Sequence, residues 1–332
     1  MARSRRPGII DVAKLAGVSL STVSRAMNDN PTVDPALAER VRAAAAELGY
    51  TANPVARSLV LGRTQTVSVV IPDLANPTFQ AILRGLSRAA AGDGYHVLIS
   101  DTAEQVDEEA ALAVATRRRT DGVILCAPRL PQDGLTPLLA AVAPAVVVNR
   151  PPQEGVPTVA ADYGTAMTQL IEHLHGLGHR RIAYLSGVVG SASGAARAAA
   201  IAAASSRLSD LTIVEIPAGV DFDSGAAAID AVVGSGATSA LAFNDLVAMG
   251  LLSAATARGI RVPSELSIAG FDDIPFAAYT TPPLTTAAVP AAELGRLAWA
   301  AMHALLTGDE ATASLTLAPE VIVRSSTGPA PH

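Results

Sequence analysis

Residues 19–28 combine short hydroxyl side chains with one arginine on a single face of a predicted helix. The apolar residues Val23, Ala26 and Met27 are spaced three and one positions apart, so they share one side of that helix. The polar residues that then face outward are Ser21, Thr22, Ser24 and Arg25. Hydroxyl and guanidinium groups can bond to base edges or phosphates in a major groove. The pattern favours a nucleic-acid contact, although any small helical bundle also has polar faces.

Two further helices are predicted to position this one within the first 50 residues. The three predicted helices are about Ile10–Ala16, Leu20–Met27 and Pro35–Leu48. Ser19 is a good N-cap for the second helix, and Asp34 followed by proline opens the third. Gly17 and Gly49 are natural helix stops. Two helices joined by a tight turn and braced by a third form a helix-turn-helix arrangement.

Residues 53–62 carry the signals of one more short helix. Asn53 is a cap, Pro54 suits the first helical position, and Gly62 ends the segment. A helix of about eight residues is too short to be stable alone in water. The segment is therefore a candidate for folding on binding, with an ordinary linker helix as the alternative.

From residue 66 onward, short apolar runs alternate with helical stretches. The predicted strands are Val67–Ile71, Tyr95–Ser100, Gly122–Cys126, Ala145–Asn149, Arg181–Ser186, Leu211–Ile216, Ser239–Phe243 and Leu266–Gly270. The clearest helical patterns are Phe79–Ala91, Thr165–Leu177 and Leu246–Arg258. Alternating strands and helices predict parallel sheets covered by helices on both faces. Eight strands over this length favour two doubly wound α/β subdomains over one large sheet.

Polar residues follow several of these strands, where ligands of such folds bind. They are Asp73, Asn76, Asp101, Asn149, Arg150, Asn244, Asp245, Asp272 and Asp273. This clustering predicts a ligand-binding cleft.

Composition narrows the class of protein. The chain has 332 residues, a net charge of −6 and one cysteine, which excludes a disulfide framework and a Cys-rich zinc site. Residues 1–63 hold nine Lys and Arg against five acids, a charge of +4, which leaves −10 on the remainder. A basic head on an acidic body predicts a nucleic-acid-binding module attached to something else. Strand-length apolar runs and the lack of a signal-peptide pattern predict a cytoplasmic protein.

Patterns of other chemistry are weak, so we expect neither an enzyme nor a metal or cofactor site. His173 and His175 project from different sides of a helix, and glycines interrupt the path to His179. Ala192 stands where a Gly-x-Ser-x-Gly elbow needs its serine. The sequence has no Walker-type Gly-Lys-Ser/Thr and no Gly-x-Gly-x-x-Gly after a strand.

Two segments of the chain carry specific motifs. Residues 10–19 read IDVAKLAGVS and residues 21–28 read STVSRAMN, while Asn53-Pro54 stands with Ala56 and Leu59. These motifs are similar to the helix-turn-helix signature and the hinge helix of the LacI/GalR family of bacterial transcription regulators, which the chain resembles over essentially its whole length. Further similar motifs are Gly178–Ala183, Asn244-Asp245, Gly270–Asp273 and Pro283–Thr286.

The resemblance implies specific roles in DNA binding. Leu20 and Ser21 fall where the family reads bases, and Arg25 follows on the same helix. Thr22, Ser24 and Asn28 resemble residues that contact phosphates. Leu59, aided by Ala56, resembles a wedge inserted from the minor groove, with Arg57 alongside the backbone. These roles imply a homodimer on a pseudo-palindromic operator of double-stranded DNA.

The resemblance also implies an effector site between the two subdomains. The matching residues are Phe79, Asp101, Asp162, Arg197, Asn244 and Asp272. Carboxylates, amides, an arginine and a flat ring suit a sugar-like ligand. The alternatives are that Asn244 and Asp272 are turn residues, Arg197 a surface residue and Phe79 plain core. Thr78, Ala200 and Val220 depart from the aromatic or glycine residues common in the family, so we expect a less aromatic pocket.

Together these inferences predict a ligand-responsive repressor that a small, sugar-like effector releases from its operator. The predicted domains are a helix-turn-helix domain at 1–52, a hinge helix at 53–63 and an effector-binding and dimerisation core at 64–332. A corepressor-dependent repressor or an activator of the same family stays open. A solute-binding protein without DNA function is less consistent with the basic head.

Overall fold

The structure is a computed structural model of the full chain, and it describes residues 7–28, 30, 32–51 and 62–331. Contacts between residues divide the chain into two compact units, residues 1–65 and 66–332. The predicted hinge residues Ala56, Arg57 and Leu59 lie outside the described residues.

The first unit contains the three predicted helices. They are α1 (Ile9–Ala16), α2 (Leu20–Met27) and α3 (Pro35–Glu47). Ser19 Oγ accepts the Thr22 amide at 3.2 Å at the start of α2, and Gly17 ends α1 with a φ of 64°. Val12, Val23 and other apolar residues from all three helices form one core. The helix-turn-helix prediction is thus confirmed in its local structure.

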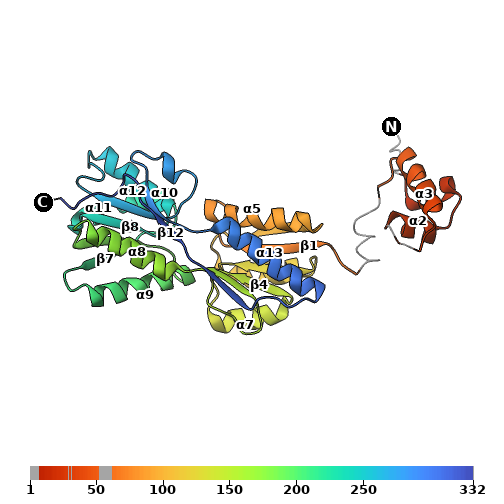
Figure 1. Cartoon of the computed structure of the whole chain (residues 1–332), viewed down its shortest axis with the longest axis horizontal. Helices are drawn as coiled ribbons and strands as arrows, with labels where there is room; N and C mark the ends of the chain where they lie inside the picture. Colours follow the sequence, from red (N-terminus) through yellow and green to blue (C-terminus); the bar gives the residue numbers. More distant parts are fainter. Residues whose placement is uncertain (1–6, 29, 31, 52–61, 332) are drawn as a thin grey trace. The chain divides into compact units, whose positions relative to one another are not determined.

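The second unit consists of two α/β subdomains, each with a six-stranded sheet in the described residues (Figure 1). The first sheet has the order β11-β5-β4-β3-β1-β2 and is parallel throughout. Its elements are β1 (Thr66–Ile71), α5 (Pro77–Gly92), β2 (His96–Asp101), α6 (Val106–Arg117), β3 (Gly122–Cys126), α7 (Gln132–Ala141), β4 (Ala145–Val148) and β5 (Thr158–Ala161). One face of this sheet packs on α5 and the other on α6 and α7.

The second sheet has the order β12-β10-β9-β8-β6-β7, and only its β10–β12 pair is antiparallel. Its elements are α8 (Tyr163–Gly176), β6 (Arg181–Ser186), α9 (Ala192–Arg207), β7 (Thr212–Pro217), α10 (Phe222–Ala227), α11 (Ile229–Gly234), β8 (Ser239–Ala242), α12 (Asp245–Ala257), β9 (Ser267–Asp272), the 3-10 helix η1 (Ala277–Tyr279) and β10 (Thr285–Ala288). Helices α8 and α9 cover one face, and α10 to α12 cover the other.

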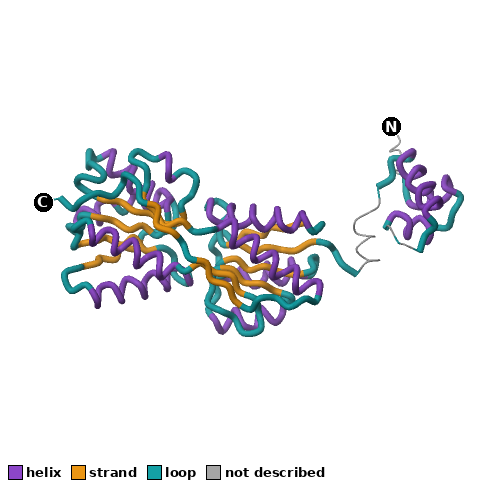
Figure 2. The backbone as a smooth tube through the Cα atoms, viewed as in Figure 1, coloured by secondary structure: helices purple, strands orange, loops and turns teal. Residues whose placement is uncertain are grey.

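The chain crosses between the two subdomains three times. It leaves the first sheet after β5, and it returns after β10 to form α13 (Ala291–Thr307) and β11 (Ser314–Leu317). Helix α13 packs beside α5 on the first sheet (Figure 1). The chain then crosses once more to β12 (Glu320–Ile322) in the second sheet. Figure 2 shows teal loop segments joining the two subdomains. Each crossing between the subdomains therefore begins after the carboxyl end of a strand, namely β5, β10 or β11.

The doubly wound two-subdomain fold is confirmed, and each of the eight predicted strands is present within two residues of its predicted bounds. Strands β5, β10, β11 and β12 were not predicted. Each has only three or four residues. None of the helices in the described part of the chain is long and apolar enough to span a membrane.

Candidate functional site

Helix α2 carries the outward-facing polar surface of the first unit. Leu20 is 48% exposed, and Ser21 and Arg25 are also exposed. Three further predicted DNA contacts are half-buried. They are Thr22 and Ser24 on the same helix and Asn28 at its C-cap. Arg25 Nε donates to the Ser21 carbonyl at 3.3 Å, a bond that can exchange for a phosphate without disturbing the core. The six predicted DNA contacts in the described residues thus lie together.

In the second unit, four of the six predicted effector residues line one cavity. Phe79 comes from the start of α5, Arg197 from α9, Asn244 from the N-cap of α12 and Asp272 from the end of β9. The cavity has a volume of about 40 Å³. Residues from both subdomains line it, as expected for a cleft at the carboxyl ends of parallel strands.

Arg197 is the most unusual of these residues. Its side chain is 2% exposed, and its guanidinium carbon lies 4.0 Å from the ring centroid of Phe271, 4.5 Å from Phe243 and 4.7 Å from Tyr163. Nη1 donates to Ser193 Oγ at 3.3 Å, whereas the buried Nε has no hydrogen-bond partner among the described residues. A buried cation with unused donors fits a ligand contact and excludes the surface-arginine alternative.

Asp272 faces the same cavity with an altered acidity. Burial raises the pKa of its carboxyl to about 6, while the nearby Arg197 and a bond from Thr78 act in the opposite direction. Thr78 Oγ1 donates to Asp272 Oδ2 at 2.8 Å. The carboxylate therefore retains acceptor capacity for ligand hydroxyls.

Asn244 has a structural role as well as a place in the cavity. Its Oδ1 accepts the Val247 amide at 2.9 Å, and its Nδ2 donates to the Val220 carbonyl at 2.8 Å. An amide side chain has two N–H groups and two lone pairs, so one of each is still open to a ligand. The turn-residue alternative and the ligand role are compatible here.

The structure does not bring Asp101 and Asp162 to this cavity. Asp101 accepts main-chain amides of Leu74 and Ala103 at 3.2 and 2.9 Å. Asp162 caps α8 by bonding Thr165, whose hydroxyl and amide hold the pKa of the carboxyl below its usual value. Asp162 lines a neighbouring cavity of about 240 Å³, which shares Asn149, Tyr163 and Ser193 with the first one. Their ligand roles stay predictions.

The cavity also holds aromatic rings from positions that the sequence did not single out, while the expectation of a pocket less aromatic than is common in the family stays a prediction. Tyr163 and Phe243 line the cavity together with Phe79. Tyr163 follows the short β5 strand, and Phe243 ends an apolar strand, so neither differs from core residues in pattern. Thr78 was noted only as a departure, yet it bonds Asp272.

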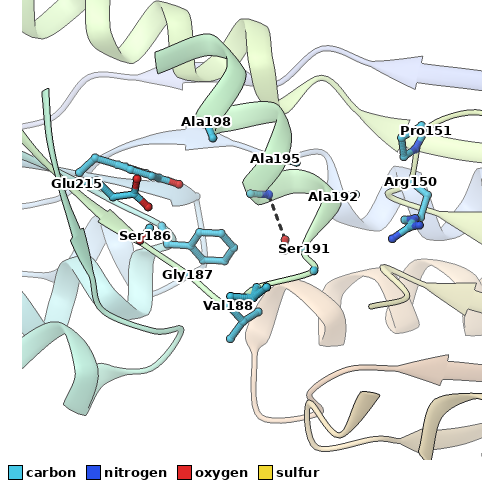
Figure 3. Close-up of a pocket in the computed structure, with 15 residues that line it drawn as sticks. Arg150, Pro151, Ser186, Gly187, Val188, Ser191, Ala192, Ala195, Ala198 and Glu215 are labelled. Atoms are coloured by element: carbon cyan, nitrogen blue, oxygen red, sulfur yellow. Dashed lines mark hydrogen bonds between the residues drawn. The ribbon is translucent and has the colours of Figure 1, made fainter. Parts of the chain in front are cut away.

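A larger cavity of about 460 Å³ shares Phe243 with the first one. Figure 3 shows Ser186 and Glu215 on one side of it, Arg150 and Pro151 on the other, and the start of α9 between them. Its lining is mostly apolar, with the carboxylate of Glu215 as the main acceptor.

The three histidines weighed as metal ligands have separate partners. His173 bonds Thr327, His175 bonds Asp210, and buried His179 bonds Thr238 and Ser267. Within the described ranges, no three His, Cys, Asp or Glu side chains gather closely enough to hold a metal ion.

Comparison with known proteins places the chain in a family. Residues 8–53 match "Bacterial regulatory proteins, lacI family", and residues 171–327 match "Periplasmic binding protein-like domain". The HTH-type transcriptional repressor CytR of Escherichia coli (strain K12) is 33% identical over 324 residues, 96% of this chain and 95% of that protein. The chain belongs to the LacI family. This LacI-family protein is a ligand-responsive, DNA-binding transcriptional repressor.

Solved structures of LacI-family proteins agree with this assignment over the whole chain. The Lac repressor dimer bound to operator and the anti-inducer ONPF has a TM-score of 0.88 at 27% identity, and the match covers 98% of this chain and 100% of that one. The complex of the transcriptional regulator CelR with cellobiose has a TM-score of 0.70 at 28% identity, covering 97% and 100%.

Proposed function

We propose that the effector is a hydroxyl-rich ring, a sugar or a close chemical relative of one, bound between the two subdomains. The observation that carries this proposal is that the buried Arg197 and the half-buried Asp272 line one cavity together with aromatic rings. The carboxylate accepts from neighbouring hydroxyls, the guanidinium donates to ligand oxygens, and the rings cover apolar C–H faces. The complex of CelR with cellobiose supports this class of ligand.

Binding of such a ring would involve the space next to this cavity. The cavity has a volume of about 40 Å³, and the neighbouring cavities of about 240 and 460 Å³ share lining residues with it. We infer that entry of a sugar shifts the relative position of the side chains or subdomains that line these cavities. To shift a 99:1 equilibrium to 1:99, the ligand must prefer one state by about 5.5 kcal/mol.

On the DNA side, we propose that a homodimer binds a pseudo-palindromic operator and that effector binding releases it. Leu20 and Ser21 would contact bases, with Arg25 following on α2, and the phosphate contacts would be Thr22, Ser24 and Asn28. Ala56, Arg57 and Leu59, in the proposed hinge at 53–63, would act at the operator centre. The helix-turn-helix domain would be 1–52 and the core 64–332. The operator-bound Lac repressor dimer supports this arrangement.

A thermal-shift screen of the full chain against D-ribose, D-glucose, cellobiose and sugar phosphates tests the effector class. A sugar at 100 times its Kd stabilises the native state by about 2.7 kcal/mol, which raises Tm by several degrees. Arg197→Met should lose this shift. Arg207→Met, an exposed change on the same helix that removes only a surface ion pair with Glu172, should retain it.

The sugar that shifts Tm is then added to the protein bound to an operator selected from random DNA. Release supports the proposal. Tighter binding would instead make the protein a corepressor-dependent repressor. If no sugar raises Tm, the proposed effector class is wrong.

A further inference from the structure

A buried carboxylate lies directly behind the effector site, although it does not line the cavity. Asp245, the first residue of α12, is 0% exposed. Thr286 Oγ1 donates to its Oδ1 at 2.6 Å, and the Ile274 amide donates to its Oδ2 at 2.8 Å. Burial, together with the neighbouring Asp272, raises the pKa of Asp245 well above its usual value. Burying a carboxyl costs free energy, so this position needs a structural or functional reason.

The partners of this carboxylate hold the turn that carries Asp272. Asp272 and Asp273 have φ values of 108° and 54°, in the left-handed region that residues with a Cβ rarely adopt. The main-chain amides of the two residues after Asp272 both donate hydrogen bonds to this pair of side chains, Asp245 and Thr286. The Asp273 amide donates to Thr286 Oγ1 at 3.3 Å, and the Ile274 amide donates to Asp245. Strained backbone persists where the surroundings fix it in this way.

Three further interactions hold this support in place. A Cβ on Gly270, in β9, would lie 2.1 Å from Asp245 Oδ1, so the strand is packed directly against the carboxylate. Thr286, in β10, pairs with Gly270 across the two strands. Arg324 Nη2 donates to Asp273 Oδ1 at 2.7 Å from the other side of the turn. The support therefore cannot shift without moving the sheet.

We propose that Asp245 and Thr286 are positioning residues, which hold Asp272 in the conformation that accepts ligand hydroxyls. The inference deepens the proposed function and rests on Asp272 being an effector contact. The alternative is that both residues only stabilise the start of α12 and the adjoining core. The two roles differ in one respect: only positioning makes the state of Asp272 depend on the hydroxyl of Thr286.

The test compares Thr286→Val with a matched variant in the other subdomain, Thr158→Val. Both threonines are buried in strands, and each hydroxyl accepts a main-chain amide at 3.3 Å, from Asp273 and from Gln153 respectively. The first readout is amide hydrogen exchange of residues 272–274 in the full-length protein without ligand. The second is the carboxyl titration of Asp272 by carbon NMR, assigned with Asp272→Asn.

We expect Thr286→Val to speed exchange of 272–274 by about tenfold, the equivalent of one lost hydrogen bond. Its Asp272 titration should move from about 6 toward the ordinary aspartate value of about 4, since the freed side chain reaches water. Thr158→Val should change neither readout, and Thr286→Ser, which keeps the hydroxyl, should restore both. If Thr286→Val and Thr158→Val behave alike, the positioning role is wrong.

A third measurement, of sugar binding, distinguishes a failure of this inference from a failure of the proposed function. Thr286→Val should weaken binding of D-ribose or cellobiose, whichever the wild type binds, by about tenfold, and it should add nothing to Asp272→Asn. Full additivity with Asp272→Asn would overturn the positioning role. If the wild type binds neither sugar, the proposed effector class loses support, while exchange and titration still decide the role of Thr286.

Discussion

The affinity of the effector should depend on pH through Asp272. Its pKa of about 6 means that the carboxyl is roughly nine-tenths ionised at pH 7 and roughly one-tenth ionised at pH 5. Ligand hydroxyls bond best to the ionised form, which offers all of its lone pairs. Affinity is therefore retained above the pKa and lost as the pH falls through it. We expect Kd to rise about tenfold between pH 7 and pH 5.

Two other carboxyls lie near Asp272, namely Glu104, which lines the same cavity and is paired with Arg129, and Asp245, whose pKa is also raised. Thr78, which donates to Asp272, has no titrating group, and burial raises the pKa of the Tyr163 hydroxyl further above neutrality. Behind it, Asp245 is buried and Asp273 is paired with Arg324. None of the described residues that line the cavity is a histidine.

Isothermal titration calorimetry at pH 5, 6, 7 and 8 measures the dependence, with the sugar that gives the largest thermal shift. Asp272→Asn should bind more weakly at pH 7 and show no change in Kd across the series. Asp162→Asn is the matched control, because the pKa of Asp162 is already lowered by Thr165, so it should keep the wild-type dependence. A wild-type Kd that is constant from pH 5 to 8 would refute the reasoning.

Three further predictions concern the DNA-binding unit and the core. Ser19→Ala removes the N-cap of α2 and should destabilise the first unit by about 1 kcal/mol. Thermal unfolding of a fragment ending at residue 65 measures this loss, and the full chain should also bind its operator more weakly. Leu59→Ala should lower operator affinity, measured by fluorescence anisotropy, while sugar binding is unchanged; equal operator affinity would contradict the proposed wedge. Gly225→Ala places a Cβ 2.1 Å from the Val247 carbonyl and should lower Tm by several degrees, whereas Gly92→Ala, whose Cβ meets open space, should change Tm by less than about 2 °C.

The fold could be predicted where the sequence carries a repeated local pattern. Helices α1 to α3 follow from their caps and apolar spacing, and the longer strands from apolar runs between helices. Strands β11 and β12 could not be predicted, since each is short and pairs with residues far away in the sequence. β11 lies beside β5, about half the chain away, and this pairing makes the chain cross back to the first sheet.

The residues of the candidate site could likewise be predicted only in part. Asn244 and Asp272 were predictable because a polar residue directly after an apolar strand lies at the binding edge of a parallel sheet. Asp101 also follows a predicted strand, and Asp162 was expected only from the family resemblance, yet both carboxylates bond nearby amides and do not line the cavity with Arg197. Spacing alone does not distinguish a local cap from a ligand contact.

By itself, the sequence determined the helix-turn-helix head, the α/β class and the edge of the sheets where we propose that the ligand binds. These depend on caps, periodicity and charge, which act between residues close together in the chain. Only the tertiary structure decided that three rings surround Arg197, that Asp272 has a raised pKa, and that Thr286 reaches the turn after Asp272. Those properties arise from burial and contact between distant segments, and no local pattern records them.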